Sequence, residues 1–283
     1  MVGAALLFAL MGVMVKVLSH SLPNAMVVFL RSGLSLLVLL PTILQRGRAR
    51  LRTRQLREHL VRGTVGMAAM SCFFYGIANL GLAEALLLNY SLPLFIPLVE
   101  RAWLGEPIAP GIWRPIAIGM LGLVLILKPG LGLFQPAALV GVLGALFAAT
   151  AQVGVRRLTL TESVTTIVFY FSVCSTMIGL GPALLAWVTP AASAVPAILG
   201  MVVAGTLAQL MMTRAYQLAP AAQVGPFIYG SVAFAALFDW LLFSHHPDGL
   251  SSVGTALVVA AGILALRAPK SPSSPTAATA LAE

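Results

Sequence analysis

Ten long apolar runs follow one another along this chain, separated by short connections rich in proline, glycine and asparagine. An α-helix needs about 20 mostly apolar residues to cross the hydrocarbon core of a bilayer. Helices also satisfy their own backbone hydrogen bonds, which lipid cannot do for them. The runs therefore predict an all-α membrane protein with ten transmembrane helices, at residues 2–18, 24–45, 62–80, 84–104, 112–128, 136–156, 163–188, 196–218, 221–243 and 250–267.

The charge distribution supports lipid, and not nucleic acid, as the main partner of the surface. Of the 283 residues, 59% are hydrophobic and 9% are charged, whereas soluble domains carry roughly 25% charged residues. The net charge is +9, but seven of the 17 basic residues lie between Arg46 and Arg62. Such a block is typical of a cytoplasmic loop in a bacterial inner-membrane protein. We therefore expect no nucleic-acid partner.

The same block sets the expected orientation. With residues 46–62 inside, both termini are cytoplasmic and 14 basic residues lie inside. Lys16 and Lys128 then lie near the outer ends of their helices, and the uncharged loop from Trp187 to Ala197 lies outside. Residues 268–283 contain mainly Pro, Ser, Thr and Ala, a composition that predicts a disordered tail.

An internal repeat appears when the sequence is displaced by 139 residues against itself. Tyr90 then falls on Tyr229, Glu100 falls on Asp239, and Lys128 falls on Arg267. The repeats, 1–133 and 134–267, hold five predicted helices each, and an odd number makes the second half enter the membrane from the opposite side. Inverted halves are common in transporters, where two alternative packings expose a central site to opposite sides. The repeat therefore predicts alternating access.

A family resemblance rests on several short stretches. Residues 89–95 read Asn-Tyr-Ser-Leu-Pro-Leu-Phe and residues 103–107 read Trp-Leu-Gly-Glu-Pro, while Phe29-Leu30-Arg31 lies in the second predicted helix. Together with the duplicated ten-helix plan they resemble the EamA type of the drug/metabolite transporter superfamily, as far as Arg267. The chain departs from that pattern at Leu10-Met11-Gly12, where the family often has Trp. The second half also departs, with Val232 in place of the proline and His245-His246 in place of the Gly-Glu turn. The resemblance implies a ten-helix exporter of aromatic and other neutral amino acids.

The fourth predicted helix carries the first group of candidate substrate-binding residues, Asn89, Tyr90 and Pro93. Pro93 has no N–H group, so the carbonyl of Asn89 loses its helical partner and can accept a bond from a substrate amine. The alternative is a proline kink with Asn89 bonded to a neighbouring helix. Tyr90 and Tyr229 are candidates for gates on either side of a central site, or for ordinary packing with satisfied hydroxyls.

Two further groups complete the candidate site. Phe73, Phe74 and Tyr75 form an aromatic cluster in the third predicted helix, which can line an apolar pocket or simply pack in the core. Gln152 and Gln209 are single amides in long apolar runs. Because an unpaired buried amide is costly, each faces either a polar neighbour or the cavity.

Ionisable residues narrow the substrate class. Most intramembrane charges are expected toward helix ends, where they can snorkel or pair; these are Lys16, Arg31, Glu84, Glu100, Arg101, Arg214 and Asp239. With no carboxylate in the middle of a helix, a neutral or zwitterionic substrate fits better than a cation. His245, His246 and Asp248 are too few ligands for a metal centre, so we expect no metal and no cofactor.

We therefore expect a monomeric membrane carrier and not an enzyme, since the four histidines assemble no catalytic constellation on facing helices. Its expected partners are lipid and a small-molecule substrate, and its expected activity is export or exchange of small neutral metabolites, above all aromatic or hydrophobic amino acids. The alternatives are an exporter of drugs or other metabolites with the same fold, and a membrane-embedded enzyme. Direction and energy coupling stay open.

Overall fold

The computed structural model describes residues 1–46, 51, 53–80, 82–130, 133, 135–243 and 248–267. Within these residues the regular secondary structure is entirely helical. Six of the described helices are long and apolar enough to cross a membrane, and α1 and α6 are shorter apolar helices. The α-helices are α1 (Val2–Leu18), α2 (Asn24–Arg46), α3 (Leu56–Asn79), α4 (Leu82–Asn89), α5 (Leu92–Leu104), α6 (Trp113–Leu127), α7 (Ala137–Leu158), α8 (Val164–Leu185), α9 (Val195–Leu218), α10 (Ala221–Val224), α11 (Gly230–Phe243) and α12 (Gly249–Arg267). The candidate tail, 268–283, lies outside the described residues.

Two of the predicted helices are interrupted, which corrects the sequence-based prediction. The run at 84–104 divides into α4 and α5 at Tyr90 and Ser91, and the run at 221–243 divides into α10, the 3₁₀ segment Gly225–Tyr229 and α11. Proline explains both breaks: Pro93 and Pro226 each occupy the first turn of a new helical segment. A proline there leaves no hydrogen bond unmade.

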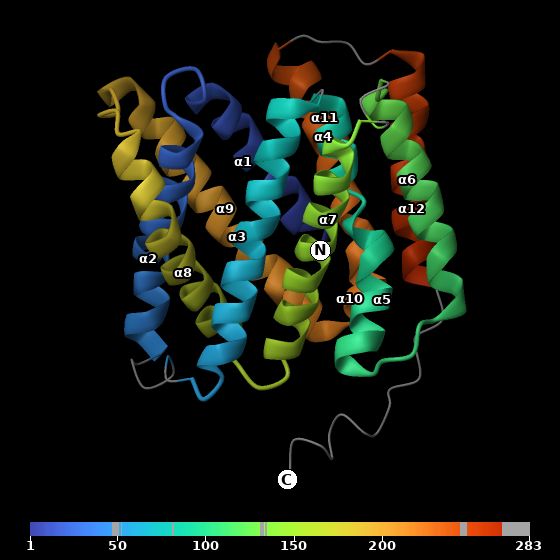
Figure 1. Ribbon diagram of the computed structural model, residues 1–283, viewed down its shortest axis with the longest axis horizontal. Coiled ribbons are helices and arrows are strands. Elements are labelled where there is room, and N and C mark those ends of the chain that lie inside the picture. The colour runs from blue at the N-terminus through green and yellow to red at the C-terminus, as the bar shows by residue number, and fades with distance from the viewer. Residues whose placement is uncertain are drawn as a thin grey trace.

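The helices pack in pairs. The pairing stays the same when each helix of the first half of the sequence is replaced by its counterpart in the second half. α3 lies along α7 and α1 lies along α9, while α2 pairs with α8 and α6 pairs with α12. The α2–α8 pair forms one side of the bundle and the α6–α12 pair forms the other (Figure 1). The limits of α9 are those of α3 displaced by 139 residues.

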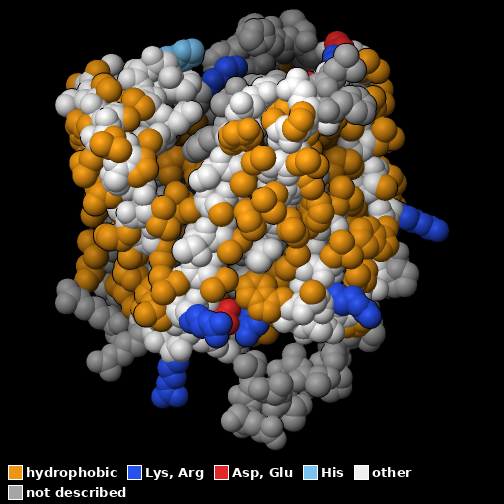
Figure 2. All heavy atoms as spheres, viewed as in Figure 1, with side chains coloured by type: hydrophobic (Ala, Val, Ile, Leu, Met, Phe, Trp, Pro, Cys, Tyr) orange, Lys and Arg blue, Asp and Glu red, His pale blue; other side chains and the backbone are white. Residues whose placement is uncertain are grey.

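The surface has an apolar middle and charged margins. Figure 2 shows hydrophobic side chains over most of one face and Lys and Arg side chains gathered near its lower edge. Leu185, with 92% of its surface exposed, is an extreme case of an apolar residue facing outward, as lipid contact requires. We call the end of the bundle with Arg101, Arg156, Arg157 and Arg214 the basic end.

At the opposite end, one exposed ion pair joins two helices. The ammonium group of Lys128, just after α6, pairs with Asp248, just before α12. This hydrogen bond, followed by those from Ser251, lowers the pKa of Asp248 to about 2. Because the pKa is depressed in the folded state, the contribution of this pair is present at neutral pH and is lost as the pH falls toward 2. The neighbouring residues His245 and His246 lie outside the described residues.

Two glycines allow α6 and α12 to approach closely. A Cβ atom on Gly122 would lie 2.7 Å from the carbonyl oxygen of Gly254, and one on Gly254 would lie 2.6 Å from the carbonyl oxygen of Gly122. Small residues bring helix backbones together in membranes, where packing replaces the hydrophobic effect between helices.

We predict that Gly122→Ala lowers the stability of the protein by about 1–3 kcal/mol, because the two backbones must move apart. Gly181→Ala is the matched control, since a Cβ at this helical position meets open space and alanine favours a helix. Thermal unfolding of the purified full-length protein in detergent measures both. An equal melting temperature for Gly122→Ala and wild type would contradict the packing argument.

Candidate functional site

Two arginines lie inside the bundle. Arg31 is the eighth residue of α2, and its Nε atom is buried. Arg62 is only 4% exposed. Of the two outcomes expected for Arg31, snorkelling or pairing, the described residues supply no partner for pairing, and its Nε atom lies at a cavity among other helices. Arg62 was counted with the basic loop, but α3 begins at Leu56, six residues before the predicted start. The first turns of α3 are amphipathic, so a search for apolar runs does not include them.

Arg31 borders a small cavity among α2, α8 and α9 that both polar and apolar residues line. Its volume is about 10 Å³, roughly the space that one water needs. The cavity is lined by Arg31, Ser32, Ser35, Val168, Phe171, Ser172, Gly205, Thr206 and Gln209. The hydroxyl of Ser35 lies 2.8 Å from that of Ser172 and joins α2 to α8. Among the described residues, the Ser32 hydroxyl and the Gln209 carbonyl oxygen have no hydrogen-bond partner.

Arg62 approaches the same region from α3. Its guanidinium carbon lies 3.9 Å from the centre of the Phe171 ring, a cation–π contact. Its Nε and Nη1 atoms are buried and donate to no described partner. One turn earlier, His59 stacks on Tyr170 with ring centres 4.6 Å apart. Neither Arg31 nor Arg62 forms an ion pair with any residue that the structure describes, so this interior region is positively charged.

A separate cleft of about 470 Å³ lies among α1, α4, α6 and α11. Its walls include Gly12, Tyr90, Ser231 and Ala235. Ser231 donates a hydrogen bond of 3.2 Å to the Tyr90 hydroxyl. Lys16 also lines the cleft and lies near the end of α1, so the cleft occupies the part of the bundle toward the end opposite the basic end.

The other predicted site residues are dispersed. Phe73 and Asn89 line a narrow gap among α3, α4 and α7, whereas Tyr75 is 46% exposed. The side chain of Phe74 lies outside the described part of the structure. Gln152 and Tyr229 have buried oxygen atoms without a partner among the described residues.

Tyr229 packs tightly on α6. A Cβ on Gly119 would lie 2.3 Å from Cδ2 of the Tyr229 ring, so only glycine fits beneath the ring. The ring belongs to a buried apolar cluster with Leu123 and Val258. Of the predicted residues, the structure brings Gln209 to the Arg31 cavity and Tyr90 to the cleft.

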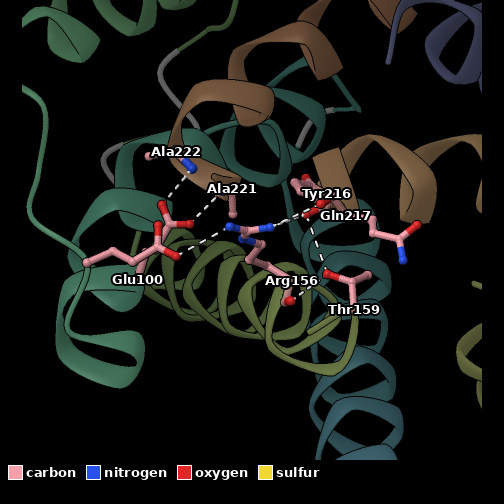
Figure 3. Close-up of polar contacts among 8 residues, drawn as sticks. Glu100, Arg156, Thr159, Tyr216, Gln217, Ala221 and Ala222 are labelled. Carbon is pink, nitrogen blue, oxygen red and sulfur yellow. Dashed lines mark hydrogen bonds and ion pairs between the residues drawn. The ribbon is translucent and has the colours of Figure 1, made fainter. Parts of the chain in front are cut away.

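At the basic end, charged side chains hold the turn between α9 and α10 (Figure 3). Glu100 of α5, 3% exposed, accepts hydrogen bonds from the backbone N–H groups of Ala221 and Ala222 at 2.6 and 2.8 Å. Arg156 of α7 donates from Nη1 to the carbonyl oxygens of Tyr216 and Gln217, at 3.0 and 3.3 Å.

Further contacts of the same group involve Glu106 and Thr159. Nη2 of Arg156 lies 3.5 Å from a carboxylate oxygen of Glu106. Thr159 donates to the carbonyl oxygen of Arg156 at 2.6 Å. We call Glu100, Glu106, Arg156 and Thr159 the clasp.

The charges of the clasp match the ends of the helices that they hold. The carbonyl groups at the end of a helix carry partial negative charge, and the free N–H groups at the start of a helix carry partial positive charge. Arg156 therefore binds the end of α9 while Glu100 binds the start of α10. Because Glu100 comes from the first half of the sequence and the turn from the second, the clasp ties the halves together.

Sequence reasoning missed Arg62, the Ser35–Ser172 contact and the clasp. One usable signal was present in α2, because Arg31 and Ser35 are four residues apart and therefore share a helix face. The bonds by which the clasp holds the α9–α10 turn left no local signal, since they reach backbone groups 57 to 122 residues distant in the sequence.

Comparison with known proteins identifies the class. The model of the EamA-like transporter family matches the chain twice, over residues 1–128 and 135–267. The protein is a multi-pass membrane transporter and not an enzyme. It belongs to the EamA-like transporter family.

Relatives of known function differ in what they carry. The chain is 34% identical to the pseudopaline exporter CntI of Pseudomonas aeruginosa, over 94% of each protein. It is 32% identical to a riboflavin transporter of Rhizobium johnstonii, over 94% of this chain and 89% of that one. It is 26% identical to an S-adenosylmethionine uptake transporter of Rickettsia felis, over 91% and 88%. One crystal structure matches with a TM-score of 0.81 at 20% identity, over 94% of this chain and 96% of that chain, which shows the fold.

We predict that Arg156→Gln lowers stability by about 2 kcal/mol, because the end of α9 loses charge-assisted hydrogen bonds. Arg214→Gln is the control, since Arg214 is an exposed arginine at the same end and bonds only Gln217 among the described residues. Thermal unfolding in detergent compares the two. Equal melting temperatures for the two variants would mean that Arg156 stabilises the protein no more than an exposed arginine does.

Proposed function

We propose that this transporter exports or exchanges small zwitterionic metabolites, such as amino acids and their derivatives, by alternating access in a bacterial inner membrane. One observation carries the proposal: the bundle has a cleft toward one end and a clasp of charged residues at the other. A carrier caught open on one side and shut on the other has this arrangement.

The mechanism rests on two inverted halves, 1–133 and 134–267, that cross the membrane ten times in total. The matching limits of α3 and α9 support this division, as do the exchangeable helix pairs. The double match of one family model, once on each side of residue 133, supports it independently. In this scheme the interrupted pairs α4–α5 and α10–α11 are the fourth and ninth crossings.

The basic end is assigned to the cytoplasm, with both termini. Positively charged loops are retained on that side during insertion. The cleft then opens to the outside and the clasp closes the inside. In this state Tyr90 lines the open path, and its bond to Ser231 links α11 to the end of α4. Tyr90 and Tyr229 remain the proposed gating pair, with Phe73, Asn89, Gln152 and Gln209 as further candidate contacts.

The charge of the interior bears on the substrate class. Two arginines with buried, unpartnered N–H groups disfavour a cationic substrate and favour one that carries a carboxylate. The relatives named for pseudopaline, riboflavin and S-adenosylmethionine carry small polar metabolites of different kinds. They support a metabolite carrier, and they leave drugs or other metabolites as the alternative substrates.

The test is counterflow in proteoliposomes that contain the purified full-length protein. Vesicles preloaded with an unlabelled amino acid mixture should accumulate the same labelled amino acids transiently, without covalent change. Failure of all twenty amino acids to exchange would contradict the proposed substrate class.

We predict that Tyr90→Ala slows this counterflow by roughly fivefold, because a substrate loses an aromatic contact in the cleft. Leu139→Ala is the control, since Leu139 is 73% exposed on α7. Equal rates for Tyr90→Ala, the control and wild type would remove Tyr90 from the substrate path.

A further inference from the structure

Arg31 and Arg62 have buried N–H groups that find no partner among the described residues. We propose that Arg31 and Arg62 form a binding site for one carboxylate group of the transported substrate. This inference rests on the proposed transport function and adds to it the groups that recognise the substrate.

The charges of Arg31 and Arg62 favour an anionic ligand. A buried charge without a counter-charge is strongly unfavourable, so buried cations normally have anionic partners. Glu100 and Arg156, which are also largely buried, obey this rule through backbone groups and Glu106. Arg31 and Arg62 do not obey it within the described residues. An anionic ligand supplies the missing charge.

The hydrogen-bond donors of this region are grouped around one cavity. Arg31, the Ser32 hydroxyl and Gln209 border the same cavity. Phe171 also lines that cavity and carries the Arg62 guanidinium over its ring. The unpartnered atoms of this group include three N–H donors, Nε of Arg31 and Nε and Nη1 of Arg62. Planar guanidinium groups match the geometry of a carboxylate.

The size of the cavity limits what it can hold. At about 10 Å³ it has room for about one water, and so for one carboxylate oxygen and not for a whole metabolite. The body of the substrate must therefore lie beside it. A Cβ on Gly205 would lie 3.2 Å from Nε of Arg31 and 2.8 Å from Sδ of Met11. Met11 precedes Gly12, which lines the cleft. Arg31 is thus separated from the cleft by α1, and a shift of α1 against α9 joins the two spaces.

The test measures binding apart from transport, on the full-length protein in detergent. Sodium propionate is the carboxylate probe, propionamide is its neutral isostere, and sodium chloride at equal concentration is the inorganic anion. Propionate should raise the melting temperature in a saturable way, while propionamide and chloride should not. Equal stabilisation by chloride would overturn the carboxylate assignment, as would no effect of propionate.

The variants locate the site. In Arg31→Gln and Arg62→Gln the half-saturating concentration of propionate should rise about tenfold or more, since bonds to charged groups are lost. Arg214→Gln should bind propionate as the wild type does. Arg31→Lys and Arg62→Lys keep the charge and serve if the glutamine variants fold poorly; a rise of severalfold is expected because lysine lacks the planar fork. Unchanged propionate binding in all of the folded Arg31 and Arg62 variants would overturn the proposal.

The two proposals fail separately. Amino acid counterflow that persists in Arg31→Gln with unchanged half-saturation would leave the carrier function intact and remove the carboxylate site. Propionate binding that depends on Arg31, in a protein with no amino acid counterflow, would keep the site and remove the proposed substrates.

Discussion

The cost of placing charge away from water governs this structure. A lipid-embedded bundle can hold a buried charge only where a counter-charge or several dipoles surround it. The clasp meets this condition with peptide groups: Glu100 binds the N–H groups that start α10, and Arg156 binds the carbonyl groups that end α9. Arg31 and Arg62 do not meet it within the described chain. The same constraint therefore assigns a structural role to one set of charges and a ligand-binding role to the other.

In the proposed alternating-access mechanism, the clasp and the cleft act at opposite ends of the bundle. The clasp joins residues from both halves of the sequence, so in that mechanism its release lets the halves rotate against one another. The cleft at the opposite end contains one neutral hydrogen bond between Tyr90 and Ser231, which is weaker than the charge-assisted bonds of the clasp. In the proposed mechanism, breaking the clasp costs more than breaking the Tyr90–Ser231 bond, and a bound substrate that offsets this cost would couple inward opening to substrate occupancy.

Much of the fold could be predicted from hydropathy, because lipid demands long apolar helices. The prediction for 2–18 coincides with α1, and that for 196–218 differs from α9 by one residue. The breaks at Tyr90 and at Gly225 were not predicted, because proline at a helix start and proline within a helix look alike in an apolar sequence. The site was harder to predict from the sequence. Tyr90 and Gln209 were identified as rare polar groups, but Arg31 and Arg62 were assigned to helix ends and a loop, since one-dimensional position does not show which way a long side chain points.

The central claim is that the clasp closes the cytoplasmic side while the cleft is open to the outside. It is tested most directly by labelling a cysteine at Gly12, where an added side chain meets open space in the cleft, after replacing Cys72 and Cys174 with alanine. A membrane-impermeant maleimide should react with Gly12→Cys from outside intact cells, and adding Arg156→Gln should slow that reaction by favouring the inward-open state. Labelling only from the cytoplasmic side, or a rate that Arg156→Gln leaves unchanged or raises, would contradict the account.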